Sequence, residues 1–162
     1  MIAINKVGEE SIGIIKNLAH IIWPVAYASI ITEEQIKYML DLFYTESSLQ
    51  KQIIEGNQFI VAFDKDEAIG FASYSSKTNY LYRLHKLYVH PNQQGKGTGK
   101  ILIDFIINDI QPKGATALEL NVNRYNKAVG FYLKNGFTVF KEQMLEIGKG
   151  YFMDDYIMIK QL

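Results

Sequence analysis

The first 55 residues carry their apolar side chains mainly at helical spacing. A weakly alternating segment at residues 2–7 predicts an opening strand, and the acidic Glu9-Glu10-Ser11 that follows suits a helix start, where the dipole favours negative charge. Pro24 should bend or end this helix, because it removes a backbone donor and clashes with the preceding turn. The helical stripe itself comprises Ile12, Ile15, Leu18, Ile22 and Val25.

Two shorter helices are expected after residue 31. Thr32 and Gln35 have the spacing of a capping box, in which two side chains satisfy free backbone amides at a helix start. Apolar residues at i, i+3, i+4 and i+7 then form the stripe Ile36, Met39, Leu40 and Phe43. Residues 48–55 predict a short third helix, so the first third of the chain is expected to be largely helical.

The period changes from helical to extended after Asn57. Residues 58–63 and 68–74 predict an antiparallel hairpin around a tight turn at 64–67. Residues 80–89 continue as the next strand.

A helix over residues 98–110 should then return the chain to a parallel strand at 117–122, through a right-handed crossover. A short helix is expected between Asn126, which can cap its start, and Gly136, which can supply a left-handed stop. A final hairpin is predicted at 137–145 and 151–160. This order predicts an α/β fold of the α+β type, with a mixed, mostly antiparallel sheet of about seven strands flanked by about four helices.

Length, charge balance and the counts of cysteine and histidine exclude several classes of function. The 162 residues suit one domain over residues 1–162. Seventeen basic and seventeen acidic side chains cancel without forming blocks, which argues against a nucleic-acid partner drawn by bulk charge. The absence of cysteine excludes a disulfide framework, thiolate metal sites and a cysteine nucleophile. Three scattered histidines are too few to indicate a metal site.

The amino-terminal ten residues lack the basic-then-apolar organisation of a secretory signal, so we expect a cytoplasmic protein. Residues 11–31 are apolar but are interrupted by polar residues and Pro24, whereas a membrane span needs about 20 mostly apolar residues. We therefore expect a core-facing helix and no membrane partner. A homodimer is compatible with these features.

The segment Gln94-Gly95-Lys96-Gly97-Thr98-Gly99-Lys100 lies between a predicted strand and a predicted helix. Glycines at alternate positions let the backbone approach a ligand closely, and the amides at a helix start can converge on negative oxygen atoms. This segment therefore predicts an anion cradle for a phosphate group.

Two common phosphate loops do not fit this spacing. A nucleotide-triphosphate loop has four residues between its glycines and then Gly-Lys followed by Ser or Thr, whereas here three residues separate Gly95 from Gly99 and Ile101 follows Lys100. The dinucleotide fingerprint needs Gly-x-Gly-x-x-Gly and an acidic residue at the end of the next strand, where Asn121 and Asn123 stand here.

The segment resembles, at every specified position, the acetyl-CoA loop Gln/Arg-x-x-Gly-x-Gly/Ala of the GNAT superfamily of N-acetyltransferases. The preceding Leu87-Tyr88-Val89-His90-Pro91 looks like the fourth strand of that family with its terminating proline. Residues 126–137 are similar to the family segment Asn-x-x-Ala-x-x-Phe-Tyr-x-x-x-Gly-Phe. The resemblance covers residues 57–140 well and the first 55 residues poorly.

The resemblance implies that a primary amine attacks the thioester of acetyl-CoA directly. In the family, the fourth and fifth strands splay apart, here near Asn121 and Val122, and free backbone groups for the cofactor. Tyr132 matches the tyrosine that protonates the leaving thiolate, although it also suits a core aromatic. Positions that match cofactor-binding ones are Leu87, Tyr88, Val89, Gln94, Gly95, Lys96, Gly97, Thr98, Gly99, Lys100 and Asn126, the last of which suits a helix cap equally well.

The general base is where the sequence departs from the family. Many members carry a glutamate just before the Leu-x-Val segment, where this chain has Lys86. A lysine with its usual pKa near 10.4 cannot take that role. His85, with an ordinary pKa near 6.5, and Glu119 on the neighbouring strand are candidates, but each residue type is more often structural.

The acceptor side is expected between the first two helices. Trp23, Tyr27 and Glu34 offer aromatic faces and a carboxylate, which suit a cationic amine. This region loosely resembles a bacterial subgroup that includes polyamine acetyltransferases, and an ordinary packed helix pair explains it as well.

The sequence thus favours an acetyl-CoA-dependent N-acetyltransferase without a metal, acting on a primary amine, with a small cationic amine or polyamine favoured. A protein acetyltransferase that modifies an N-terminus or a lysine is the enzyme alternative, with a peptide amine as acceptor. A catalytically silent CoA-binding sensor and a nucleotide-binding module are the alternatives from other classes.

Overall fold

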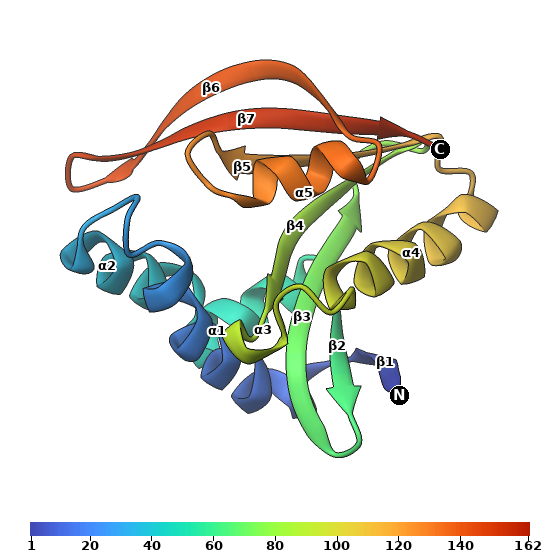
Figure 1. Cartoon of the computed structure of the whole chain (residues 1–162), viewed down its shortest axis with the longest axis horizontal. Helices are drawn as coiled ribbons and strands as arrows, with labels where there is room; N and C mark the ends of the chain where they lie inside the picture. Colours follow the sequence, from blue (N-terminus) through green and yellow to red (C-terminus); the bar gives the residue numbers. More distant parts are fainter.

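The computed structural model describes residues 1–162, in which seven strands form one sheet with helices on both faces (Figure 1). The strands are β1 (Ile2–Val7), β2 (Gln58–Asp64), β3 (Glu67–Ser76), β4 (Leu81–Val89), β5 (Ala117–Asn123), β6 (Thr138–Gly148) and β7 (Tyr151–Gln161). The α-helices are α1 (Ile12–Ala26), α2 (Glu33–Phe43), α3 (Glu46–Ile54), α4 (Thr98–Ile110) and α5 (Ala128–Lys134). The predicted order of elements and the mixed sheet are confirmed, with five α-helices rather than about four.

The starts and stops of the helices follow from local chemistry. The Thr32 hydroxyl accepts a hydrogen bond from the Gln35 amide at 3.1 Å, which is one half of the predicted capping box. The Gln35 side chain does not complete the box, because it donates to the Phe152 carbonyl at 3.3 Å and so ties α2 to β7. Pro24 lies inside α1, which continues to Ala26 before it ends.

Two apolar clusters hold the helices on opposite faces of the sheet. In β2, Phe59 and Val61 pack against α1, α2 and α3, whereas Ile60 and Ala62 pack on the face that α4 and α5 cover. All four of these β2 residues are fully buried. Because both faces of β2 are covered, its sequence is a continuous apolar run rather than an alternating one.

Asp109 on α4 ties this helix to the sheet. Its carboxylate accepts hydrogen bonds from Lys6 at 2.6 Å, from the Tyr74 hydroxyl at 2.8 Å and from Lys113 at 3.2 Å. Burial alone would raise the pKa of Asp109, but these three hydrogen bonds together lower it to about 2.

The strand order is β1-β2-β3-β4-β5-β7-β6, and β4 with β5 is the parallel pair. These two strands stay paired only from Leu81 with Ala117 to Leu84 with Leu120. Beyond that point they diverge, and the sheet opens into the V seen between β4 and β5 in Figure 1.

A β-bulge lies where the two strands begin to diverge. Against β3, Leu84 pairs with Tyr74 and Lys86 pairs with Ser73, so His85 is an extra residue without a partner. A bulge bends its strand and increases the local twist. The insertion at His85 therefore turns β4 away from β5 directly after their last pair.

The β6–β7 hairpin reaches across to α2. The Tyr38 hydroxyl donates a hydrogen bond to the Ile147 carbonyl at 2.8 Å, and the Tyr38 ring lies 5.2 Å from the Tyr151 ring. Figure 1 shows the hairpin tip beside α2. None of the helices is long and apolar enough to cross a membrane.

Candidate active site

A cleft of about 250 Å³ occupies the gap that the diverging strands leave. Residues of β4 and β5 form its two walls, and residues of α1, α2, α5, β6 and β7 complete its lining. The bulge and the early end of β4–β5 pairing are thus the local causes of the cleft.

Aromatic rings form the side of the cleft next to α1. The Trp23 ring lies 4.4 Å from the Tyr27 ring and 5.7 Å from the Tyr88 ring, centroid to centroid. The hydroxyls of Tyr27 and Tyr88 are 3.0 Å apart and share a hydrogen bond. Burial raises the pKa of both tyrosines, which keeps both phenols protonated. Trp23 and Tyr27, two of the three residues predicted for the acceptor side, therefore line the cleft.

Glu34 is not brought to this cleft. It lies exposed in the first turn of α2 and is not among the residues that line the cavity. An acidic residue in this turn is favoured by the helix dipole whatever else it does.

The β4 wall presents a free backbone edge. Leu87, Tyr88 and Val89 pair with β3 on one side, whereas on the other side no β5 residue pairs with them. Apart from the Val89 carbonyl, which accepts a hydrogen bond from the Gln94 side chain, their outward backbone groups are therefore free to pair with an extended ligand, as an added strand would.

The glycine segment follows β4 and leads into α4. Gly95 and Gly97 have φ values of +77° and +83°, and a Cβ built at either position meets no atom within 4 Å. None of the backbone amides of residues 95–100 donates a hydrogen bond within the protein. The loop thus offers open space and free donors at a helix N-terminus, which is the environment that an anionic phosphate requires.

The side chains around this loop are not all aimed outward. The side-chain amide of Gln94 donates a hydrogen bond to the Val89 carbonyl at 3.2 Å, and the Lys100 ammonium forms an ion pair with Asp104 at 2.6 Å. Thr98 is buried. Only its backbone amide is therefore placed to contact a ligand, while Lys96 is exposed.

Gly99 joins the loop to the second motif of the sequence. A Cβ at this position would lie 2.9 Å from Cζ of Phe131, which is closer than real side chains approach. Only glycine lets α5 pack this closely against the start of α4, so residues 94–100 and α5 are held together.

Tyr132 on α5 is buried and lines the cleft. Its ring packs edge-on against Phe131 and Phe137, with centroid distances of 5.3 Å and 5.5 Å. Its hydroxyl makes no hydrogen bond within the protein. Burial raises the pKa of Tyr132, so the hydroxyl keeps its proton at neutral pH. A protonated hydroxyl thus borders the cavity.

Asn126 also lines the cleft, next to α5. Its side-chain oxygen accepts a hydrogen bond from the Ala128 amide at 2.9 Å. The Asn126 side chain thus caps the first backbone amide of α5 from one residue before the N-cap Lys127.

The two candidate bases are held in different ways. Nε2 of His85 lies 2.7 Å from the Ser75 hydroxyl, and partial burial followed by the charges of Arg83 and Lys86 lowers the pKa of His85 to about 4. Glu119 is buried and accepts hydrogen bonds from Lys77 at 2.7 Å and Arg83 at 3.4 Å. Neither side chain is presented to the cleft as an unengaged base.

Lys86 behaves differently from an ordinary surface lysine. Its ammonium lies 5.1 Å from the centre of the Tyr44 ring and 5.8 Å from that of Phe43, and it has no carboxylate partner. Desolvation lowers the pKa of Lys86 to about 8. The expectation of an ordinary lysine pKa near 10.4 at this position is therefore wrong.

Asp155 on β7 is a cleft residue that the sequence did not single out. It is only 1% exposed and lines the cavity. Burial raises its pKa. The adjacent pair Asp154-Asp155 in a predicted strand could have indicated this residue. Successive strand residues face opposite sides of the sheet, so one of the two carboxylates must lie on the side that the helices cover.

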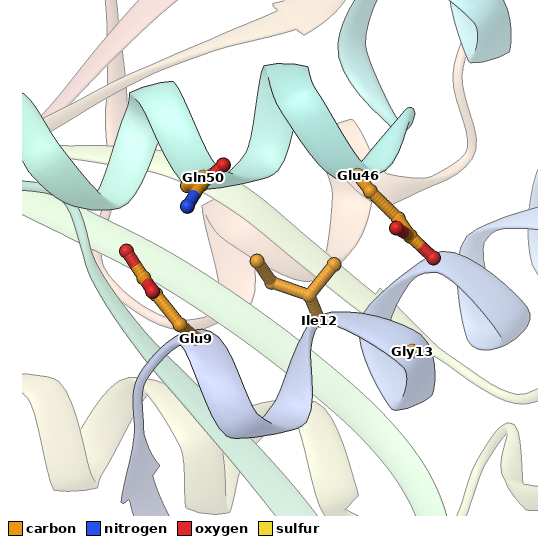
Figure 2. A pocket seen from close by; sticks show the side chains of 5 residues that line it. All are labelled: Glu9, Ile12, Gly13, Glu46 and Gln50. Atoms are coloured by element: carbon orange, nitrogen blue, oxygen red, sulfur yellow. The ribbon is translucent and has the colours of Figure 1, made fainter.

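A second hollow, of about 300 Å³, lies between the start of α1 and α3, away from this cleft (Figure 2). It is lined by Glu9, Ile12, Gly13, Glu46 and Gln50. Figure 2 shows the two glutamates on opposite sides of a polar depression that has one apolar side chain. No group of three or more His, Asp or Glu side chains in the protein could hold a metal ion.

Comparison with known proteins gives a consistent result. A family model described as an acetyltransferase (GNAT) domain matches residues 27–150. The spermidine N(1)-acetyltransferase of Thermoplasma acidophilum is 30% identical over 144 residues, which cover 85% of this chain and 89% of that relative. A peptidyl-lysine N-acetyltransferase of Salmonella typhimurium is 31% identical over 99 residues, which cover 60% of this chain and 61% of that relative.

Among solved structures, the PaiA N-acetyltransferase of Thermoplasma acidophilum in complex with coenzyme A superposes with a TM-score of 0.86. The two sequences are 29% identical, and the superposition covers 100% of this chain and 99% of that one. The similarity therefore extends to the first 55 residues, where the sequence motifs gave least information.

Proposed function

The chain belongs to the GNAT family of acetyltransferases, and from this premise we propose that residues 1–162 form one catalytic domain that moves the acetyl group of acetyl-CoA to a primary amine. The amine attacks the thioester directly, with both substrates bound together. A small cationic amine or a polyamine is the favoured acceptor.

The open edge of β4 beside the glycine loop is the observation that carries this proposal. The free amides of residues 95–100 would hold the CoA pyrophosphate, and the unpaired edge of Leu87, Tyr88 and Val89 would hold the pantetheine arm. Each charge-assisted hydrogen bond contributes about 1.5–3 kcal/mol, and a partly buried helix N-terminus contributes up to about 2 kcal/mol. Bound in this way, the thioester supplies the acyl group.

Tyr132 would act as the general acid. Its hydroxyl borders the cleft, keeps its proton at neutral pH and has no protein partner to compete with a ligand. A phenol placed within hydrogen-bond reach of a leaving sulfur stabilises the developing thiolate and passes it a proton. The burial that raises the pKa of Tyr132 thus keeps the acid in its active form.

A cationic acceptor is supported by the aromatic side of the cleft and by the relative that is a spermidine acetyltransferase. Trp23 and Tyr27 offer ring faces to a positive charge, and Asp155 is the carboxyl group that lines the cavity. Glu34 would contribute only to a long acceptor that extends out of the cleft toward α2, because it lies outside the lining.

An amine panel tests this proposal. Release of CoA thiol from acetyl-CoA is followed with spermidine, a diamine and an alkyl monoamine of equal length that carries no second charge, and the products are identified by mass spectrometry. Spermidine and the diamine should show the higher kcat/KM, and their advantage should shrink as salt screens charge over about 8–10 Å. Equal kcat/KM for all three amines would contradict a cationic acceptor site.

A peptide amine is the second candidate acceptor, because the similarity to a peptidyl-lysine acetyltransferase covers 60% of the chain. Adding a lysine peptide and a peptide with a free N-terminus to the same panel separates the two proposals. Turnover confined to the peptides would move the assignment to protein acetylation.

A further inference from the structure

Asp155 is a buried acidic group that the proposed mechanism does not yet use. Its Oδ1 atom is buried and has no hydrogen-bond partner, and its Oδ2 atom lies 3.5 Å from the Asn121 side-chain amide, at the limit of a hydrogen bond. Oxygens of buried carboxyl groups normally have partners, because each one gave up its water on folding. This carboxyl group borders the cleft with most of its bonding capacity unused.

Its place in the sheet is fixed by pairing on both sides. Asp155 pairs with Asn123 on β5 and with Gln143 on β6. Asn123 lies beyond the last residue of β5 that pairs with β4, so Asp155 stands directly behind the open part of the wall. Asp155 is therefore held on the β5 side of the cleft, where β5 has already separated from β4.

Titratable and charged groups reach Asp155 from several elements. Burial raises its pKa most, the Asn121 hydrogen bond lowers it, the charge of Asp154 on the same strand raises it, and Arg83 on β4 lowers it. The charge of Asp155 also raises the pKa of Tyr27, which directly follows α1. The other titratable groups that line the cavity are His85, Lys86 and Tyr88 on β4, Tyr132 on α5, and Tyr44, which directly follows α2. The lining residues that belong to α2 and β6 are all apolar.

We propose that Asp155 receives the acceptor: its carboxylate binds the ammonium form of the amine in the cleft and takes the proton that must leave before the nitrogen can attack. This inference rests on the proposed acetyl transfer. It assigns to β7 the proton acceptor that β4 lacks, since the β4 position holds Lys86.

One proton moves from the ammonium nitrogen to Asp155, which leaves a neutral amine. The nitrogen lone pair forms the new bond to the thioester carbon, and the carbon–sulfur bond breaks with its electron pair on sulfur. The second proton lost by the nitrogen goes to solvent, and the sulfur receives a proton from Tyr132. Asp155 then gives up its proton and Tyr132 regains one through solvent, so the products are the acetylated amine, CoA thiol and one net proton.

This role predicts a particular pH dependence. If the amine enters as its cation and the proton stays on Asp155, the ground state and the transition state contain equally many protons. The kcat/KM for total amine is then flat with pH between the pKa of Asp155 and that of the amine, near 10.4 for an alkyl ammonium. Without the carboxylate, the amine must lose its proton to solvent first, and kcat/KM rises about tenfold per pH unit up to that value.

The variant Asp155→Asn tests this, with Asp154→Asn as the matched control. Asp154 is the neighbouring carboxylate on β7, and it pairs with Arg124 at 2.8 Å instead of lining the cleft. With spermidine between pH 6 and pH 9, Asp155→Asn should lose about 10²–10⁴-fold in kcat/KM at pH 7 and show the rising profile. Asp154→Asn should keep the flat profile.

A merely structural Asp155 would lower kcat/KM by one factor at every pH and leave the slope unchanged, which would overturn the inference. The profile of kcat/KM against pH could instead change slope near pH 8, both in the wild type and in Asp155→Asn, and lose this change in Lys86→Met. That result would also overturn the inference, and it would assign the proton to Lys86. Thermal unfolding of both aspartate variants shows whether each is folded at the assay temperature.

A second measurement needs neither a folded variant nor turnover. Carbon-13 NMR of the aspartate carboxyl groups in the wild-type protein with CoA bound follows the titration of Asp155 with and without spermidine. The pKa of Asp155 should lie above the ordinary aspartate value and should fall when spermidine is added, because a neighbouring cation favours the carboxylate. A titration that spermidine leaves unchanged refutes the contact. Acetyl-CoA binding without turnover of any amine would refute the proposed function instead.

Discussion

Replacing Gly97 by aspartate is a direct perturbation of the proposed pyrophosphate site. Gly97 is the N-cap of α4, has a φ of +83° and faces open space, so an added side chain has room. The left-handed backbone costs a non-glycine residue about 1–2 kcal/mol, and aspartate and asparagine adopt it more readily than other residues. The variant should therefore fold, with a modest loss of stability.

The expected loss of binding comes from charge. Two unit charges 4 Å apart repel by about 4 kcal/mol at an effective dielectric constant of 20. Solvent around this exposed loop reduces that figure, and about 3 kcal/mol corresponds to a loss of about 100-fold in affinity. Gly97→Asn has almost the same shape and backbone strain without the charge, so it should lose only a few-fold.

Isothermal titration calorimetry with CoA measures both dissociation constants, and thermal unfolding reports the stability of each variant. The difference between the aspartate and asparagine variants should shrink as salt rises. If the two variants bind CoA equally, charge at this position is irrelevant. If Gly97→Asp also matches the wild type, the reasoning that places the pyrophosphate on this loop is refuted.

Three further predictions concern single side chains. Tyr132→Phe should leave the dissociation constant for acetyl-CoA unchanged and lower kcat about 10²–10⁴-fold, and an unchanged single-turnover rate would rule out the acid role. Lys86→Met should raise the free energy of unfolding at pH 7 by about 1 kcal/mol, because the folded-state pKa of about 8 shows that the buried ammonium is disfavoured. For the same reason the wild type should become more stable from pH 8 to pH 10 in urea titrations, and the variant should not. Asp109→Asn should lower the free energy of unfolding by about 2 kcal/mol at pH 7. This difference should shrink as pH falls from 4 through the folded-state pKa of about 2, because the folded carboxylate then becomes protonated as the unfolded one already is, and a difference that keeps its full size at pH 2 would contradict the pairing of Asp109.

The fold could be predicted from sequence where local chemistry sets the structure. The Thr32 cap, the stop at Gly136 and the change of period after Asn57 each act within a few residues, and each is found where predicted. The crossover through α4 also follows locally, because a glycine loop and a single helix leave few ways to reach a parallel strand.

The chemistry of the cleft depended on contacts between distant segments. The low pKa of Lys86 arises because Phe43 and Tyr44 from the end of α2 cover it, and no local pattern around residue 86 indicates that burial. The bulge at His85 is likewise visible only against β3.

The acceptor side shows the same limit. The carboxyl group in the cleft comes from Asp155 near the end of the chain, whereas Glu34, closer in sequence to the aromatic wall, is exposed and does not line the cleft. Helical spacing predicts which residues share a face of a helix, but it does not predict which strand will stand across the cleft from that face.

A mass-spectrometric measurement of the products formed from acetyl-CoA and spermidine by the purified wild-type protein tests the proposed acetyl transfer directly. We expect mono-acetylated spermidine and CoA thiol in equal amounts, with no acetylated protein intermediate. Binding of acetyl-CoA without formation of an acetylated amine, from spermidine or from any other amine or peptide of the panel, would contradict it.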